Sequence, residues 1–204
     1  MRHPLTRFVV LTLGTLLVSC GGERSVLVSP LPGDSNPTLG AIPGPERAKI
    51  RPLERASGLG NDISWSFDAG PEGVFVRHPS TGLTVSIPQG ALSAPTRITV
   101  TALAGNAVAY RFEPHGLQFA SPVQLSQSLR GIKVKRDALG FPRLVGGYFP
   151  EDTLPTDPAT HLAQVVELLP VWLDDGGKSA RIEVRHFSGY TVASAAHEPV
   201  DGHR

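Results

Sequence analysis

The chain has 204 residues, of which 40% are hydrophobic and 18% charged. This length allows one domain of ordinary size with a signal and a linker, and it excludes two full hydrophobic cores. Loss of residues 1–19, which hold Arg2 and Arg7, lowers the 19 basic residues to 17 against 18 acidic ones, a net charge of about −1. No basic run exceeds two residues, so nucleic acid is not an expected partner.

The first residues are typical of an export signal. Arg2, His3 and Arg7 form a positively charged start, and the eleven residues 8–18 (FVVLTLGTLLV) are apolar and uncharged. This run is about half of the roughly 20 residues that an α-helix needs to cross the hydrocarbon core. We therefore predict a signal peptide over residues 1–19 rather than a membrane-spanning helix.

Residues 17–20 (LVSC) resemble the lipobox of bacterial lipoproteins, in which an aliphatic residue and small residues precede a cysteine. The resemblance implies cleavage before Cys20 and a covalent lipid on Cys20. Apart from that lipid, we expect no cofactor and no metal. Several acyl chains make such an anchor lasting, because each buried methylene contributes about 0.8 kcal/mol. The alternative is a buried core strand with an accidental cysteine.

The surroundings of Cys20 favour the lipoprotein interpretation. It is the only cysteine in the chain, so an exported protein has no second thiol with which to form an internal disulfide. Gly21 and Gly22 follow, without the aspartate that resembles an inner-membrane retention signal. The sequence therefore predicts a lipid-anchored envelope protein, on the outer membrane if the cell is Gram-negative.

The rest of the chain divides by composition. Residues 20–62 are rich in Gly, Pro and Ser and are predicted to form a lipidated N-terminus and linker. A flexible stretch of about 40 residues has a root-mean-square span of roughly 35 Å. Residues 63–196 are predicted to form a β domain, and residues 197–204 a disordered tail.

The predicted β domain shows short runs rich in β-branched residues between turn-forming residues. Apolar and polar side chains alternate in residues 97–103 and 180–185, which predicts half-buried strands. Residues 174–177 (DDGG) predict a hairpin turn. For residues 159–169 the sequence pattern fits either a strand or a short helix. The expected strands are residues 74–78, 83–87, 97–103, 108–113, 123–128, 144–149, 165–173, 180–185 and 190–194. Nine short strands predict an all-β, antiparallel β-sandwich.

Three segments carry a family resemblance: residues 86–92 (SIPQGAL), 110–119 (YRFEPHGLQF) and 121–125 (SPVQL). Their order and spacing resemble the ZU-five domain of ankyrins, zonula occludens scaffolds, netrin receptors of the uncoordinated type and bacterial exported proteins. The resemblance covers residues 70–104 and 108–125 and implies a β-sandwich. Pro88 is predicted to end a strand, and Pro122 to open the next one.

Residues 186–188 (HFS) resemble the self-cleavage motif of some death-domain proteins that carry a ZU-five domain. By that resemblance Ser188 is the nucleophile, His186 is the base, and the bond between Phe187 and Ser188 is cut. The alternative interpretation is structural: Phe187 and Tyr190 fill the core while Ser188 and Gly189 form a turn.

The other polar and aromatic residues have ordinary interpretations beside functional ones. His115 could serve as metal ligand or acid and base, or bond to the backbone of its corner. A Pro-rich loop holds three carboxylates that could bind calcium, namely Glu151, Asp152 and Asp157. Three aromatic residues could line a carbohydrate site or fill the core, namely Trp65, Trp172 and Tyr148.

Two classes of function follow. The first is a non-catalytic interaction module that binds an envelope or extracellular protein or glycan. The second is a domain that cuts itself once between Phe187 and Ser188. A turnover enzyme is not expected, because the sequence holds no Gly-x-Ser-x-Gly, no His-Glu-x-x-His and no phosphate-binding glycine loop.

Overall fold

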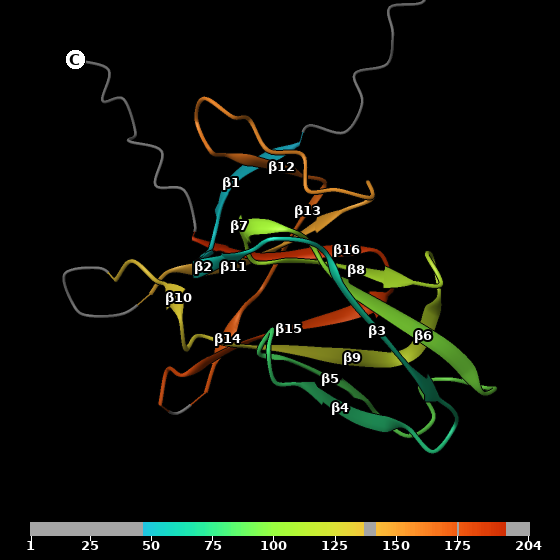
Figure 1. Cartoon of the computed structure of the whole chain (residues 1–204). Helices are drawn as coiled ribbons and strands as arrows, with labels where there is room; N and C mark the ends of the chain where they lie inside the picture. The colour runs from blue at the N-terminus through green and yellow to red at the C-terminus, as the bar shows by residue number, and fades with distance from the viewer. Residues whose placement is uncertain (1–46, 137–141, 175, 195–204) are drawn as a thin grey trace, which may run out of the picture. The chain divides into compact units, whose positions relative to one another are not determined.

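The computed structural model describes residues 47–136, 142–174 and 176–194, and these residues form strands but no helix. All the strand pairs are antiparallel. Two large sheets form two layers, with β16 and β8 in one and β15, β9 and β5 in the other (Figure 1). The predicted all-β sandwich is therefore confirmed.

The strands of the described residues follow one another closely along the chain. They are β1 (Ala48–Pro52), β2 (Glu54–Leu59), β3 (Ile63–Ala69), β4 (Val74–His78), β5 (Leu83–Ile87), β6 (Thr96–Ala102), β7 (Gly105–Ala107), β8 (Ala109–Glu113), β9 (Gln118–Ser128), β10 (Ile132–Lys133), β11 (Leu144–Phe149), β12 (Ala163–Val165), β13 (Glu167–Leu169), β14 (Trp172–Leu173), β15 (Ser179–His186) and β16 (Gly189–Ser194).

The larger sheet depends on β16, the last strand of the described residues. Its order is β12-β1-β16-β8-β6-β3, and β11 also pairs with β16 and with β13. Strand β16 therefore has partners from the beginning, the middle and the later part of the described chain, namely β1, β8 and β11. This sheet is complete only when the C-terminal strand is in place.

The second large sheet has the order β14-β15-β9-β5-β4, with the eleven-residue strand β9 at its centre. A small third sheet contains β10, β2 and β7. The chain passes from the second sheet to the first between β15 and β16, at Phe187 and Ser188.

One hydrophobic core fills the space between the layers. Both sheets contribute fully buried side chains, among them Ile98, Val100 and Phe112 from one sheet and Val85, Val123 and Ile182 from the other. On β15 the buried residues alternate with more exposed ones, as the period-two pattern predicted. On β6 the alternation holds from Arg97 to Val100 and then ends, because Thr101 is buried like its neighbours Val100 and Ala102. Burying one such large apolar side chain stabilises the fold by about 1.5–3 kcal/mol.

The folded part begins earlier than the sequence indicated. Strands β1 and β2 lie within residues 20–62, the range predicted as linker. Strand β1 is short and ends at Pro52, and β2 is mostly exposed, so neither has the sustained apolar pattern by which strands are recognised. The predicted signal peptide, Cys20 and the tail 197–204 lie outside the described residues. Within the described residues no helix is long and apolar enough to cross a membrane.

Two further predictions of local structure were wrong. Residues 165–173 were expected as one strand, but they divide among β12, β13 and β14, which belong to two different sheets, and Pro170 separates the last two. Pro122 was expected to open a strand, yet β9 already begins at Gln118 and runs through it. The predicted hairpin at residues 174–177 is confirmed as the connection from β14 to its neighbour β15.

Gly189 is required by a close approach rather than by its backbone conformation. A Cβ atom at this position would overlap the ring of Phe149, which is fully buried on the paired strand β11. The ring lies in the packed core and has no open space into which to move. The glycine after Phe187 and Ser188 is thus part of the packing between β11 and β16.

We expect Gly189→Ala to lower the free energy of unfolding by about 1–3 kcal/mol, because the added methyl group overpacks the site. Urea unfolding of the whole protein measures this. Gly176→Ala is the matched control: Gly176 is exposed in the β14–β15 turn, and its change is expected to stay within about 0.5 kcal/mol. Equal stability of the two variants would contradict the close approach at Gly189.

Candidate functional site

The predicted cleavage bond lies inside the sandwich, where the chain crosses from β15 to β16. Phe187 is completely buried, and Ser188 is 1% exposed. The ring of Phe187 stacks on Phe112 with the ring centroids 4.8 Å apart. It also forms an edge-to-face pair with Phe119, with the ring centroids 4.6 Å apart. The structural interpretation of the aromatic residue therefore holds: Phe187 is part of the core.

The side chain of Ser188 contacts a histidine, but not the one predicted. Its Oγ lies 2.8 Å from Nε2 of His115 and 3.3 Å from the carbonyl oxygen of Phe149. The hydroxyl has one proton, which it donates to Nε2 when that nitrogen is unprotonated and to the Phe149 carbonyl when Nε2 carries a proton. His115 lies in the exposed corner between β8 and β9, and its imidazole reaches inward to the buried hydroxyl. A base and a hydroxyl nucleophile at hydrogen-bond distance are the first requirement for activating a serine.

His186, the base predicted by resemblance, has other partners. Its Nδ1 lies 3.2 Å from the hydroxyl of Tyr190, which donates to the carbonyl oxygen of His186 at 2.6 Å. Burial raises the pKa of Tyr190 well above its usual value, with Tyr148 and Glu167 adding to the shift, so this hydroxyl stays protonated. His186 is two residues from Ser188 in sequence, but the chain crosses between the sheets at Phe187 and Ser188. The side chain of His186 therefore contacts Tyr190, whereas that of Ser188 contacts His115.

Hydrogen bonds hold the peptide bond between Phe187 and Ser188 on both sides. The backbone N–H of Gly116 donates to the carbonyl oxygen of Phe187 at 2.8 Å, and the N–H of Phe187 donates to the carbonyl of Leu117 at 2.9 Å. The N–H of Phe112 donates to the carbonyl of Ser188 at 2.9 Å. Gly116 has a positive φ of 77°, a conformation that glycine adopts without strain.

The corner of His115 and Gly116 therefore supplies two groups at one peptide bond. The imidazole meets the hydroxyl of Ser188, and the Gly116 N–H meets the carbonyl oxygen where negative charge would develop during acyl transfer. The sequence marked this corner as the end of a strand, but nothing local shows that it reaches a serine 73 positions away. The pairing of β8 with β16 and the pairing of β9 with β15 bring the two segments together.

A second candidate site lies on the outer face of the five-stranded sheet. It is a groove of about 530 Å³ with a large aromatic residue from each edge strand: Phe75 of β4 is 71% exposed and Trp172 of β14 is 42% exposed. The guanidinium of Arg181 lies 5.7 Å from the ring centre of Trp172. The other lining residues are Thr84, Ser86, Gln124, Ser126, Leu173, Asp174 and Ser179.

The strand register arranges the polar side chains of this groove in rows. Ser86 of β5 pairs with Phe75 on one side and with Gln124 of β9 on the other. A parallel row runs from Thr84 through Ser126 and Arg181 to Trp172. With neighbouring strands about 4.8 Å apart, the five strands span roughly 19 Å. The outer face thus presents hydroxyl, amide and guanidinium groups between two exposed aromatic rings.

Of the three aromatic residues that the sequence offered for a carbohydrate site, only Trp172 lines this groove. Trp65 instead stacks on His78 with the ring centres 4.0 Å apart. Tyr148 packs against His186 and Tyr190 at centroid distances of 5.0 and 5.8 Å. Phe75 was missed, although the alternation of residues 74–78 already placed it on the opposite face from Val74 and Val76.

The carboxylates proposed for calcium each have a partner of their own in the structure. Glu151 forms an ion pair with Arg47, and Asp152 lies 3.8 Å from Arg111. Asp157 accepts a hydrogen bond from the N–H of Ala159 at 2.8 Å, and this bond lowers the pKa of its carboxyl. Within the described residues, no group of three or more His, Cys, Asp and Glu residues could hold a metal ion.

No protein-family model matches the sequence, and no curated protein matches it.

Proposed function

We propose that this chain is a lipid-anchored envelope protein whose β-sandwich binds a carbohydrate and does not catalyse a reaction. The observation that carries the proposal is the outer face of the five-stranded sheet, where Phe75 and Trp172 stand exposed on opposite edges. The resemblance of residues 17–20 to a lipobox supports the anchor at Cys20. The expected place is the outer membrane if the cell is Gram-negative.

The composition of the groove fits a sugar chain better than a protein surface. The two faces of a sugar ring are largely C–H and pack on aromatic rings, while its hydroxyl groups need donors and acceptors. Thr84, Ser86 and Gln124 supply both donors and acceptors. The core of a protein interface would instead bring apolar side chains together, whereas a polar row here separates the two aromatic rings.

A single self-cleavage is a second candidate, favoured by the contact of His115 with Ser188. In that reaction Oγ of Ser188 attacks the carbonyl carbon of Phe187 and its proton passes to Nε2 of His115. The carbon–nitrogen bond breaks as the nitrogen takes up that proton, which leaves Phe187 esterified to Oγ and Ser188 with a free amine. Water then hydrolyses the ester. The Gly116 N–H stabilises the oxyanion of the first step.

The same contacts also serve a domain that stays intact. They give the buried hydroxyl and the backbone groups of the crossing their hydrogen-bond partners, as buried polar groups require. The same hydrogen bonds would be present in a purely structural contact and in a serine about to attack. Only a test for cleavage distinguishes the two. We place the intact binding module first because all three backbone hydrogen bonds hold the crossing in its uncleaved form.

For carbohydrate binding, we expect Trp172→Ala to weaken retention of the whole protein in gels that contain a bound polysaccharide. The expected loss is about ten-fold in affinity, equal to about 1.4 kcal/mol, because one of the two aromatic contacts is removed. Affinity electrophoresis with xylan, dextran, a soluble β-glucan and solubilised peptidoglycan provides the measurement.

Trp65→Phe is the matched tryptophan control, because Trp65 lies outside the groove and phenylalanine retains a ring against His78. This variant should be retained like the unaltered protein. Lack of retention by every polysaccharide of the panel would overturn carbohydrate binding, and so would equal retention of Trp172→Ala and the unaltered protein.

For self-cleavage, the test is a denaturing gel with N-terminal sequencing of the smaller piece. If the bond is cut, Ser188→Ala and His115→Gln each leave one full-length band, because they remove the nucleophile and the base that contacts it. His186→Gln should still give two pieces, since His186 contacts Tyr190 instead. One intact band from the unaltered protein rules out self-cleavage and leaves His115 and Ser188 as a structural tie.

A further inference from the structure

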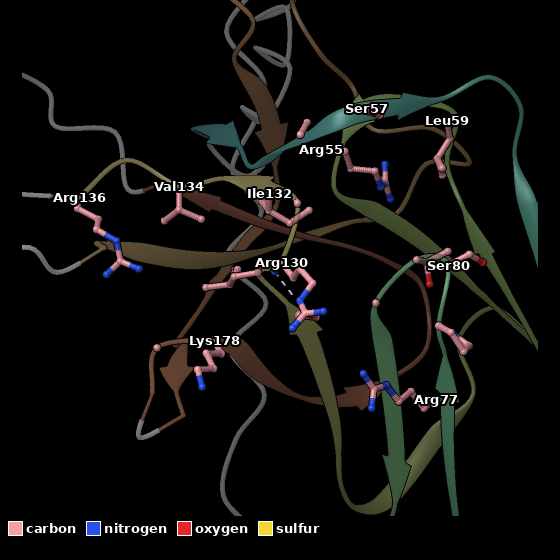
Figure 2. Close-up of a pocket in the computed structure, with 18 residues that line it drawn as sticks. Arg55, Ser57, Leu59, Arg77, Ser80, Arg130, Ile132, Val134, Arg136 and Lys178 are labelled. Carbon is pink, nitrogen blue, oxygen red and sulfur yellow. Dashed lines mark hydrogen bonds between the residues drawn. The ribbon is translucent and has the colours of Figure 1, made fainter.

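A second groove, of about 940 Å³, gathers positive charge from segments that are far apart in sequence (Figure 2). Arg55 comes from β2, Arg77 from β4, Arg130 from the turn after β9, and Lys178 from the turn before β15. Arg136 also lines it. Among the described residues, none that lines this groove is Asp or Glu.

The positive charge of this groove is opposite in sign to the net charge of the mature chain. The chain without its predicted signal carries a net charge of about −1, so the positive groove is a local feature and not the average surface. In the part of the chain that the structure describes, no carboxylate forms an ion pair with Arg55, Arg77, Arg130 or Lys178. Asp174 lines the aromatic groove and accepts hydrogen bonds from the backbone N–H groups of Lys178 and Ser179. Those bonds, with a smaller contribution from the charge of Lys178, lower the pKa of the Asp174 carboxyl, so this carboxylate offsets part of the Lys178 charge without forming an ion pair with it.

Arg55 is the least expected of these cations, because it is only 6% exposed. Its Nη1 donates to the carbonyl oxygens of Leu103 and Ala107, while Nε and Nη2 are buried without a hydrogen-bond partner. Its guanidinium lies 5.8 Å from the ring centre of Tyr110. A buried charge without a counter-charge is unfavourable, and in a low-dielectric wall its field is poorly screened.

Tyr110 does not provide the missing negative charge. Burial raises the pKa of its hydroxyl, and the neighbouring Arg55 and Thr81 offset this only in part, so the hydroxyl is neutral at ordinary pH. The hydroxyl instead donates to Gln127 at 2.6 Å. An anion in the groove would therefore be the counter-charge that the fold itself does not supply to Arg55.

We propose that this groove binds a ligand that carries several phosphate groups. Arginine matches the geometry of phosphate oxygens, and three exposed arginines line the groove together with Lys178. The hydroxyl groups of Ser57 and Ser80 add donors. None of the lining residues described is aromatic, so the bases of a nucleic acid would find no ring on which to stack.

The groove is also large enough for more than one phosphate group. Its volume lies at the upper end of the range for small-molecule sites, about 300–1,000 Å³. The phosphates could belong to a soluble polyphosphate or to phosphorylated headgroups on a membrane. Both sources present the same chemistry to Arg77, Arg130 and Lys178. This site is separate from the carbohydrate proposal and does not depend on it.

The test uses calorimetric titration of the whole protein with tripolyphosphate, at low and at moderate salt. We expect saturable binding that weakens as salt rises, because phosphate contacts to exposed cations are screened. The double variant Arg130→Gln with Lys178→Gln removes two exposed groove cations and should lower the affinity at least ten-fold. The matched control is Arg51→Gln with Arg185→Gln, which removes the same charge from exposed positions outside the groove.

A second arm distinguishes the source of the phosphates. Vesicles of neutral lipid are compared with vesicles that also contain phosphatidic acid, and tripolyphosphate is added as competitor. Binding to the phosphatidic acid vesicles that tripolyphosphate displaces indicates headgroups, and binding to tripolyphosphate alone indicates a soluble ligand. The proposal is overturned if tripolyphosphate does not bind, or if the control double variant loses as much affinity as the groove variant.

Discussion

The burial of Phe187 is the interaction on which the rest of the structure depends. Phe187 lies in the chain between β15, which belongs to the five-stranded sheet, and β16, which pairs with three strands of the larger sheet. Its ring packs on Phe112 and Phe119 in the middle of the core. Because this side chain packs between the two layers, it fixes where the backbone crosses from β15 to β16 and therefore where Ser188 lies.

This constraint explains why the short motif around Phe187 carries so many contacts. Ser188 must lose its contact with water, and His115 and Phe149 supply the polar partners. Gly189 must approach the Phe149 ring, so no side chain fits there. Tyr190 returns its hydroxyl to His186. Packing and hydrogen bonding thus explain each residue of the motif. Self-cleavage is not needed to explain why these residues are present.

The sequence was sufficient for the sandwich but not for all of its strands. Strands β4, β5 and β11 were predicted with their observed bounds, because short β-branched runs between turn residues mark a strand locally. Strand β3 alternates from Ile63 to Ala69 and could have been recognised in the same way. Strands β1, β2, β7 and β10 are short or exposed and exist because partners far along the chain pair with them.

The candidate sites, too, were predicted only in part from the sequence. Trp172 was named from the sequence, and Phe75 lay within a strand that was predicted, but only the register places them on opposite edges of one face. His186 was taken as the base because it adjoins Ser188 in the motif, while the contact belongs to His115 on another strand corner. The cations of the larger groove are scattered along the chain, so the sequence contains no run of basic residues from which the groove could have been predicted.

The proposed account places two binding surfaces on a sandwich held at a membrane by Cys20, with the crossing at Phe187 intact. Intact-mass analysis of the protein purified from the membranes of the cell that makes it tests this most directly. The account predicts the mass of residues 20–204 plus covalent lipid, in one piece. A mass that retains residues 1–19, an unmodified thiol at Cys20, or a chain cut before Ser188 would contradict it.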